Sequence, residues 1–254
     1  MDTAKIETRL HELADEYPEP MRAEQHRDVA RVSFNISLAI SGMDVASTRV
    51  CDLGGGVGLF SLGCKGIGCR RSVLVDDFRD GINLARGDSV LESHRRLGVE
   101  ICSRDVVLEP LAIDGQFDVV TTFDSMEHWH HSPRRLFHEV MGLLRPGGRF
   151  VLGVPNCINL RKRITVPLGY GKWSAFKEWY EPDRFRGHVR EPDVQDLRSI
   201  GADMGLCDIR IIGRNWTGHA SPNRITQIAA MLVDVPLRAL PTLCGDIYLV
   251  GSKP

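Results

Sequence analysis

Residues 49–58, with the sequence Arg-Val-Cys-Asp-Leu-Gly-Gly-Gly-Val-Gly, constrain the fold of this 254-residue chain more than any other segment. The apolar run Val50–Leu53 predicts a buried strand. Glycine permits a positive φ and lets a ligand approach the backbone without a Cβ in the way. A strand, a glycine turn and a helical pattern that resumes at Leu59 are the layout of a nucleotide-type cofactor site in an α/β sheet. The turn itself contains Gly54, Gly55, Gly56 and Gly58.

The spacing of these glycines bears on the kind of cofactor. A dinucleotide-binding turn reads G-x-G-x-x-G and brings a helix N-terminus to a pyrophosphate. This chain reads G-G-G-x-G two residues after Asp52. A carboxylate at that place would repel a pyrophosphate and could accept hydrogen bonds from an ammonium group. A generic dinucleotide turn and a plain glycine loop remain alternatives at this step.

Two further strands are predicted to lead into acids. Residues 72–75 form a second apolar run, and residues 99–102 form a third. In a dinucleotide site, an acid about 20 residues beyond the glycine turn binds the ribose hydroxyls. That distance favours Asp76 over its neighbour Asp77. The third strand leads into Asp105 and Val106.

A fourth strand is predicted over residues 117–122, and it leads into Phe123 and the pair Glu127-His128. Residues 143–152 then read as a helix end, a Pro-Gly-Gly turn and a fifth strand. Four segments in this order over residues 49–156 resemble the class I S-adenosylmethionine (SAM)-dependent methyltransferases. Within that family they are similar to the small-molecule branch.

The resemblance implies an α/β fold, with the Rossmann-like, doubly wound seven-stranded mixed sheet of the class, and it implies SAM as the cofactor. In the family, the first acid and the glycine turn hold the amino acid end of SAM. The acid after the second strand binds the ribose, and the acid-apolar pair after the third strand holds the adenine. The implied cofactor-binding residues are Asp52, Gly54, Gly55, Gly56, Gly58, Asp76, Asp77, Asp105, Val106 and Phe123.

Composition and charge exclude some partners. The chain has 32 Lys and Arg, 33 Asp and Glu, and a formal net charge of −1, so no global field indicates nucleic acid or a membrane. Seven cysteines without zinc-type spacing, and an N-terminus without an apolar signal region, indicate reduced thiols in the cytoplasm. Charges and prolines interrupt the apolar stretch 225–250, so no transmembrane segment is expected.

We predict a single methyltransferase domain over residues 1–254. Its expected parts are N-terminal helices (1–45), a SAM-binding core (46–156), a substrate cap insertion (157–192) and a C-terminal part of the sheet (193–254). Helices are predicted over residues 4–16, 22–41 and 194–204. Two more strands, over residues 208–212 and 247–250, would complete seven.

The histidines after the fourth strand are candidate bases. Methyl transfer is an in-line displacement in which the enzyme mainly positions the nucleophile. An alcohol that acts as the nucleophile must also lose a proton. Histidine is the commonest base near neutral pH. His128 lies where some sugar O-methyltransferases carry a catalytic histidine; His131 is the second candidate, and a packing role is the alternative. No metal is expected, because the adjacent His130 and His131 would point apart on a helix, although Asp124 keeps a magnesium site open.

The insertion is expected to select the acceptor. Residues 157–190 contain eight Lys or Arg against three acids, with six aromatic residues. Aromatic faces beside basic groups suit a sugar ring, or an aromatic acceptor that carries phosphate or carboxylate. A solvated basic surface is the alternative, and single-stranded RNA would also fit. The predicted acceptor contacts are Trp129, Asn156, Trp173, Tyr180, His188 and Arg190.

Residues 187–192, and the helix expected after them, are similar to a bacterial branch associated with glycan biosynthesis. This resemblance favours O-methylation of a small hydroxylated acceptor, such as a saccharide or glycolipid, with S-adenosylhomocysteine as the second product. No nucleic acid partner is expected, and the oligomeric state stays open. Two other classes also stay open: a methyltransferase of RNA or protein, and a non-catalytic SAM-binding protein.

Overall fold

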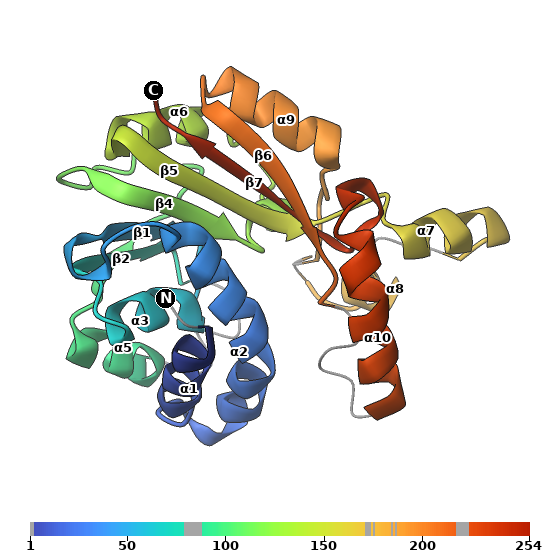
Figure 1. Cartoon of the computed structure of the whole chain (residues 1–254), viewed down its shortest axis with the longest axis horizontal. Helices are drawn as coiled ribbons and strands as arrows, with labels where there is room; N and C mark the ends of the chain where they lie inside the picture. Colours follow the sequence, from blue (N-terminus) through green and yellow to red (C-terminus); the bar gives the residue numbers. More distant parts are fainter. Residues whose placement is uncertain are drawn as a thin grey trace. The chain divides into compact units, whose positions relative to one another are not determined.

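The computed structural model describes residues 3–78, 88–170, 174, 176–183, 185, 187–216 and 224–254 (Figure 1). Within these residues, seven strands form one sheet in the order β3-β2-β1-β4-β5-β7-β6. This sheet confirms the predicted Rossmann-like α/β fold and its two C-terminal strands. The strands are β1 (Arg49–Leu53), β2 (Arg71–Asp76), β3 (Glu100–Ser103), β4 (Phe117–Phe123), β5 (Leu144–Pro155), β6 (Cys207–Arg214) and β7 (Asp246–Ser252).

Helices of very different length accompany the strands. The three helices predicted over residues 4–16, 22–41 and 194–204 are confirmed as α1, α2 and α9. A short 3-10 turn, η3 (Met126–His128), carries the candidate base. The α-helices are α1 (Thr3–Ala14), α2 (Glu19–Ile40), α3 (Leu59–Gly66), α5 (Glu92–Leu97), α6 (Arg134–Leu143), α7 (Leu160–Thr165), α8 (Phe176–Tyr180), α9 (Val194–Asp203) and α10 (Arg224–Leu237).

Strand β1 determines where the sheet can bind a ligand. It pairs in parallel with β2, where Cys51 is opposite Val73, and with β4, where Cys51 is opposite Val120. Residues Val50 to Leu53 are buried, as expected of a parallel strand covered on both faces. The strand order reverses between β1 and β4. Open α/β sheets bind ligands at the carboxyl ends of strands at such a switch point, which here is the position of the glycine turn.

The chain packs as two compact units, which we describe separately. Unit 1 comprises Met1–Phe123, Arg134–Val151 and Ser252–Pro254, and unit 2 comprises Asp124–Pro133 and Leu152–Gly251. The glycine turn therefore belongs to unit 1. The Glu127-His128 pair and the insertion belong to unit 2. The predicted subdivision of the chain at residues 45, 156 and 192 stays a prediction.

Unit 1 packs its two N-terminal helices against α3. Leu10 of α1 and Ile36 of α2 are fully buried. A Cβ on Gly63 of α3 would come within 2.6 Å of Leu10 Cδ2 and 2.8 Å of Ile36 Cδ1. Because glycine has no Cβ, the three helices can approach this closely. This packing holds in place the helix that begins immediately after the glycine turn.

The Pro-Gly-Gly segment, expected as a turn before the fifth strand, lies inside β5. Gly147 has a positive φ of 71°. Its N–H donates to Lys253 O at 2.9 Å, and the N–H of Lys253 donates to Gly148 O at 2.8 Å. Backbone hydrogen bonds to the C-terminal segment thus extend the strand pairing through these residues.

Unit 2 contains helices that the sequence analysis did not predict. Helices α7 and α8 lie in the insertion, and α10 occupies part of the apolar stretch read as interrupted. Of the interrupting residues, Pro236 lies in the last turn of α10 and Asp234 is buried. None of the helices in the described ranges is both long and apolar enough to span a bilayer.

Candidate functional site

The glycine turn leaves β1 through backbone conformations that favour glycine. Gly54 and Gly56 have φ values of 70° and 55°, a region that residues with a Cβ rarely adopt. The N–H of Gly54 donates to Val75 O at 2.7 Å, which fixes the turn against the end of β2. A Cβ on Gly55 would overlap the Asp52 carboxylate and lie 2.8 Å from Leu74 Cδ1. The backbone of Gly55 therefore lies directly on the Asp52 side chain, and the chain can pass this closely only because the residue has no Cβ.

Asp52 lies beneath this turn and is almost completely buried. Ser61 Oγ of α3 donates to its Oδ2 at 2.9 Å, and Thr121 Oγ1 of β4 donates to its Oδ1 at 2.9 Å. Burial raises the pKa of Asp52 to about 6, although these two hydrogen bonds lower it; the nearby carboxylate of Asp76 adds to the increase. The Asp52 carboxyl thus connects three elements around the turn through neutral partners.

Asp76, the last residue of β2, reaches the same turn. Its Oδ2 accepts a hydrogen bond from Gly56 N at 2.9 Å, and its Oδ1 accepts one from Phe78 N at 2.8 Å. Phe78 itself has a positive φ of 51°. Asp77 follows in the chain and is half-buried. Of the two acids, the structure places Asp76 directly against the glycine turn.

Asp105 and Val106 follow β3 in unit 1. The Oδ1 atom of Asp105 accepts hydrogen bonds from Val107 N and Leu108 N, both at 2.9 Å, so its side chain orders a tight turn. Val106 is buried. Phe123, at the end of β4, packs edge-to-face on Phe60 of α3 with ring centroids 4.9 Å apart. These residues stand at the carboxyl ends of β3 and β4.

Sequence reasoning missed two residues that support the turn. The hydroxyl of Tyr17 donates to Val57 O at 2.8 Å, and Nε2 of His94 lies 3.3 Å from Gly58 O. Burial lowers the pKa of His94 to about 4, so the ring is neutral at physiological pH and can donate from Nε2. No motif identifies either residue, because Tyr17, between α1 and α2, and His94, in α5, reach the turn only through packing.

In unit 2, the candidate base lies in a group of polar side chains. The carbonyl oxygen of Glu127 accepts hydrogen bonds from Val189 N at 2.7 Å and Arg190 N at 3.2 Å. These bonds join η3 to the C-terminal end of the insertion. The rings of His128 and His188 meet edge-to-face, with centroids 4.8 Å apart. The structure thus brings together two predicted site residues that are 60 positions apart in the chain.

Glu191 and Lys162 hold the second histidine of this group. Nδ1 of His188 lies 2.7 Å from Glu191 Oε1, and Lys162 Nζ forms an ion pair with Glu191 Oε2. Glu191 and Lys162 are both buried. Burial raises the pKa of Glu191, but the hydrogen bonds from His188 and Lys162 outweigh it and bring this pKa below its ordinary value. An ionised Glu191 therefore fixes the orientation of the His188 ring.

The same group could hold a divalent cation. Glu127, His128 and His188 offer ligand atoms that all lie within 4.8 Å of one another. This is a different set from the adjacent histidines considered in the sequence, since His130 and His131 are exposed residues after η3. A ring nitrogen of His128 cannot bind an ion and accept a proton at once. The base role and a metal role of His128 therefore exclude each other.

The other predicted acceptor contacts are dispersed over unit 2. Asn156 is fully buried; its Nδ2 donates to Thr242 O and Cys244 O, which favours a structural role. The remaining positions differ widely in exposure. Trp129 is half-buried beside His128, Arg190 is an exposed residue that donates to Asp196 at 3.0 Å, Tyr180 is 67% exposed on α8, and Trp173 lies outside the described residues.

Comparison with known proteins agrees with this geometry. A family model described as a methyltransferase domain matches residues 4–210. No curated protein matches the chain. Among solved structures, it is similar to a SAM-dependent methyltransferase of Thermotoga maritima described as a possible histamine N-methyltransferase. That similarity has a TM-score of 0.54 and 15% identity, over 91% of this chain and 95% of that one.

Two similar structures contain S-adenosylhomocysteine. Magnesium protoporphyrin IX methyltransferase from Synechocystis has a TM-score of 0.55 and 14% identity, over 93% of this chain and 88% of that one. The N-methyltransferase NodS from Bradyrhizobium japonicum has a TM-score of 0.51 and 13% identity, over 90% and 87%. The matched family model covers most of the sequence, and the switch point carries the glycine turn and its acids. The chain therefore belongs to the class I SAM-dependent methyltransferases and uses SAM as its cofactor.

Proposed function

We propose that this methyltransferase transfers the methyl group of SAM to an oxygen atom of a sugar-containing or other small hydroxylated acceptor. One observation carries the proposal: two histidine rings meet at 4.8 Å, and a buried, ionised carboxylate orients one of them. An alcohol must lose its proton as it attacks, and an oriented imidazole group is suited to accept that proton. An amine acceptor could instead deprotonate in water before it binds.

The residues of unit 1 fit SAM. SAM supplies an activated methyl group on a sulfonium centre. We assign the glycine turn and Asp52 to its amino acid end, because the space beside Gly56 is open to a ligand and Asp52 offers a carboxyl to an ammonium group. Asp76, with Asp77 beside it, is assigned to the ribose. Asp105 and Val106 are assigned to the adenine, and Phe123 is assigned to the cofactor site at the end of β4.

In unit 2, His128 is assigned to the proton. Its ring belongs to η3, which the bonds from Val189 and Arg190 hold in place. His188 packs against it and is itself fixed by Glu191, so the base would be positioned before the acceptor arrives. His131 remains the second candidate. Acceptor contacts are assigned to Trp129, Asn156, Trp173, Tyr180, His188 and Arg190 as predicted, and the direct bonds of Asn156 make it the weakest of these.

The test is methyl transfer by His128→Ala, with a panel of hydroxylated saccharides and glycolipids as acceptors. We expect turnover to fall about 100-fold to 10,000-fold, as for the loss of a general base, while S-adenosylhomocysteine still binds. His130→Ala is the matched control and should retain turnover. If His128→Ala kept full turnover, the base assignment would be wrong. A chelator should leave the rate of methyl transfer by the unaltered enzyme unchanged. If the chelator abolished this rate and added metal restored it, His128 would be assigned to a metal ion instead.

The basic insertion keeps a second candidate function open, which is methylation of RNA. Its support is the charge of residues 157–190, which hold eight Lys or Arg and three acids. RNA binding through this segment would weaken steeply with salt because counterions are released. SAM binding without turnover on any acceptor would instead indicate a non-catalytic SAM-binding protein.

The free thiols of all seven cysteines support the expected cytoplasmic location.

A further inference from the structure

The two units differ sharply in their exposed apolar side chains. Seventeen large apolar side chains in the described part of the chain are exposed, and Leu108 is the one that belongs to unit 1. The other sixteen belong to unit 2. They concentrate in two segments, residues 164–180 and residues 225–240. An apolar surface of this extent is typical of a site that binds a partner or a membrane.

Helix α10 presents its apolar side chains outward. Ile225, Ile228 and Leu232 are 77%, 55% and 69% exposed, and Met231, Val233 and Val235 are exposed as well. Asp234 is the buried residue among the side chains described in this helix. A surface helix ordinarily buries its apolar stripe and exposes its charges. In α10 this arrangement is inverted.

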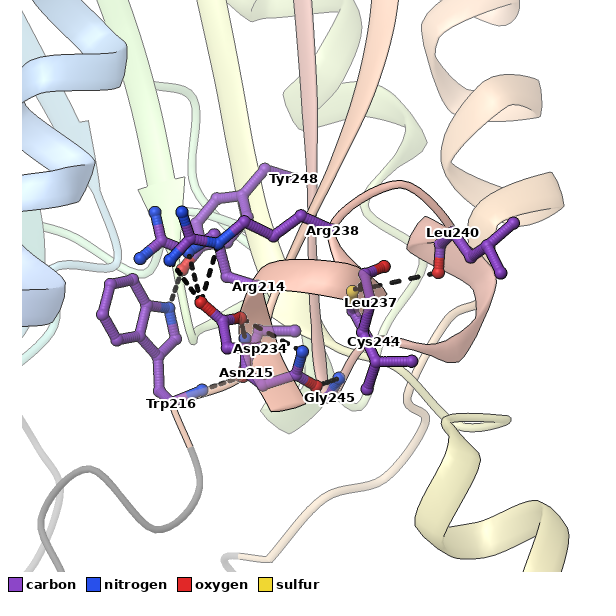
Figure 2. A network of polar contacts seen from close by, with 11 residues as sticks. Arg214, Asn215, Trp216, Asp234, Leu237, Arg238, Leu240, Cys244, Gly245 and Tyr248 are labelled. Carbon is purple, nitrogen blue, oxygen red and sulfur yellow. Dashed lines mark hydrogen bonds and ion pairs between the residues drawn. The ribbon is translucent and has the colours of Figure 1, made fainter. Parts of the chain in front are cut away.

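A polar network explains how α10 is attached (Figure 2). Asp234 Oδ2 accepts a hydrogen bond from Arg238 Nε at 2.7 Å and forms an ion pair with Arg214 Nε at 3.6 Å. Its Oδ1 accepts a hydrogen bond from Asn215 N at 2.8 Å. Arg214 is the last residue of β6 and Asn215 follows it, so the helix is joined to the end of this strand through its one acid.

The network continues to β7, as Figure 2 shows. The guanidinium of Arg214 lies 4.5 Å above the Trp216 ring, and Trp216 Nε1 donates to the hydroxyl of Tyr248 at 2.8 Å. Asp234 is the one acidic residue in the sequence of α10. Its burial in this network leaves no negative charge on the outward face. That face is therefore apolar, with Arg224 at its N-terminal end.

The second segment combines aromatic and basic side chains. Phe176 and Tyr180 of α8 stack at 4.8 Å, and Trp179 is 60% exposed beside them. Lys177 lies in the same short helix. Trp and Tyr concentrate where an apolar phase meets water, and Lys and Arg are attracted to anionic lipid head groups.

We propose that the outward face of α10 and the exposed side chains of residues 164–170 and 176–180 form a docking surface for an anionic lipid bilayer. Charge complementarity supports this occupant: residues 157–190 hold eight of the 32 Lys and Arg but three of the 33 Asp and Glu. Lys162 is buried in its ion pair with Glu191, whereas Arg161, Arg163 and Lys177 are exposed. An apolar helix of this length that cannot span a bilayer suits a position in the plane of the interface. Exposed aliphatic side chains such as Leu168 and Leu232 have no use in binding RNA. The inference does not depend on the acceptor proposed above.

The experiment is co-flotation of the full chain with vesicles of phosphatidylcholine alone, or of equal parts phosphatidylcholine and phosphatidylglycerol. We expect flotation with the anionic vesicles and weaker flotation as salt is added. Leu232→Glu and Ile228→Glu should each weaken partition about tenfold or more, because a charge replaces an aliphatic side chain that the bilayer would otherwise bury. Leu108→Glu is the matched control, since Leu108 is 57% exposed in unit 1, and it should partition like the unaltered chain.

Circular dichroism of each variant shows that it remains folded, since all three positions are exposed. Lys177→Glu should reduce flotation with the anionic vesicles and leave flotation with phosphatidylcholine vesicles unchanged. No flotation, or flotation that Leu232→Glu leaves unchanged, would overturn the proposal. The proposal would also be overturned if the chain did not float but formed a dimer that Leu232→Glu dissociates. A second copy of the chain would then occupy this surface. Salt-sensitive RNA binding without flotation would overturn it as well.

Discussion

Buried acids in the two units have opposite surroundings. Asp52 in unit 1 bonds to the hydroxyls of Ser61 and Thr121, and burial raises its pKa to about 6. Asp234 in unit 2 is buried too, but Arg238, Asn215 and Arg214 outweigh its burial and bring its pKa below its ordinary value. A buried carboxylate that already has cations around it serves the fold. A buried carboxyl held by neutral groups can still receive a cation, and here the ammonium group of SAM is the candidate.

Glu191 gives the largest expected effect, because it is, like Asp234, a buried carboxylate with a cation beside it. Glu191→Gln leaves the buried cation of Lys162 without its charge partner. Breaking a buried ion pair in this way costs about 3–5 kcal/mol of the free energy of unfolding. Denaturant unfolding measures it. Glu181→Gln, an exposed position of the same unit, is the matched control and should change stability by less than about 0.5 kcal/mol. Equal effects of the two substitutions would contradict the structural role of Glu191.

The raised pKa of Asp52 predicts an unusual pH dependence of stability. Between its ordinary pKa of 3.8 and about 6, the native state holds a proton that the unfolded state has lost. The contribution of Asp52 is thus fully present below the unfolded pKa and is lost as pH rises through the folded one. The free energy of unfolding should fall by roughly 3 kcal/mol across this window relative to Asp52→Asn. Thermal unfolding of both chains from acid to neutral pH measures it, and parallel curves would contradict the buried, hydroxyl-bonded arrangement.

Gly55→Ala sharpens the comparison at the turn. The added Cβ would overlap the Asp52 carboxylate and approach Leu74, so we expect a loss of about 1–3 kcal/mol from overpacking. Affinity for S-adenosylhomocysteine should fall as well, because the added Cβ displaces the Asp52 carboxylate that we assign to the ammonium group. Gly142→Ala is the matched control: it has nothing within 4 Å and lies in α6, where alanine should stabilise the helix slightly. Unchanged affinity in Gly55→Ala would show that the position of the Asp52 carboxylate does not affect ligand binding.

The sequence predicts unit 1 better than unit 2 for a physical reason. The strands around Asp52 and Asp76 are continuous apolar runs that end in glycines and acids, and each signal is contained in a few consecutive residues. The family resemblance assigns these segments in order. The supporting contacts of Tyr17 and His94 escape prediction, because they depend on how helices distant in sequence pack around the turn.

In unit 2, the decisive pairings join distant parts of the chain. His188 was predicted as an acceptor contact, but its ring contact with His128 and its bond to Glu191 follow from folding of the insertion. Helix α10 was missed for a related reason. Asp234 reads as an interruption of an apolar stretch until the ion pairs with Arg214 and Arg238 are known.

The central claim is that the neutral surroundings of Asp52 prepare it for the ammonium group of the cofactor. Calorimetric titration with S-adenosylhomocysteine across pH, with NAD as the control ligand, tests it most directly. We expect S-adenosylhomocysteine to bind and NAD not to bind. Affinity should fall by about tenfold per pH unit below about 6, where Asp52 takes up its proton, and Asp52→Asn should remove this dependence. Binding of NAD, or an affinity for S-adenosylhomocysteine that pH and Asp52→Asn leave unchanged, would contradict the account.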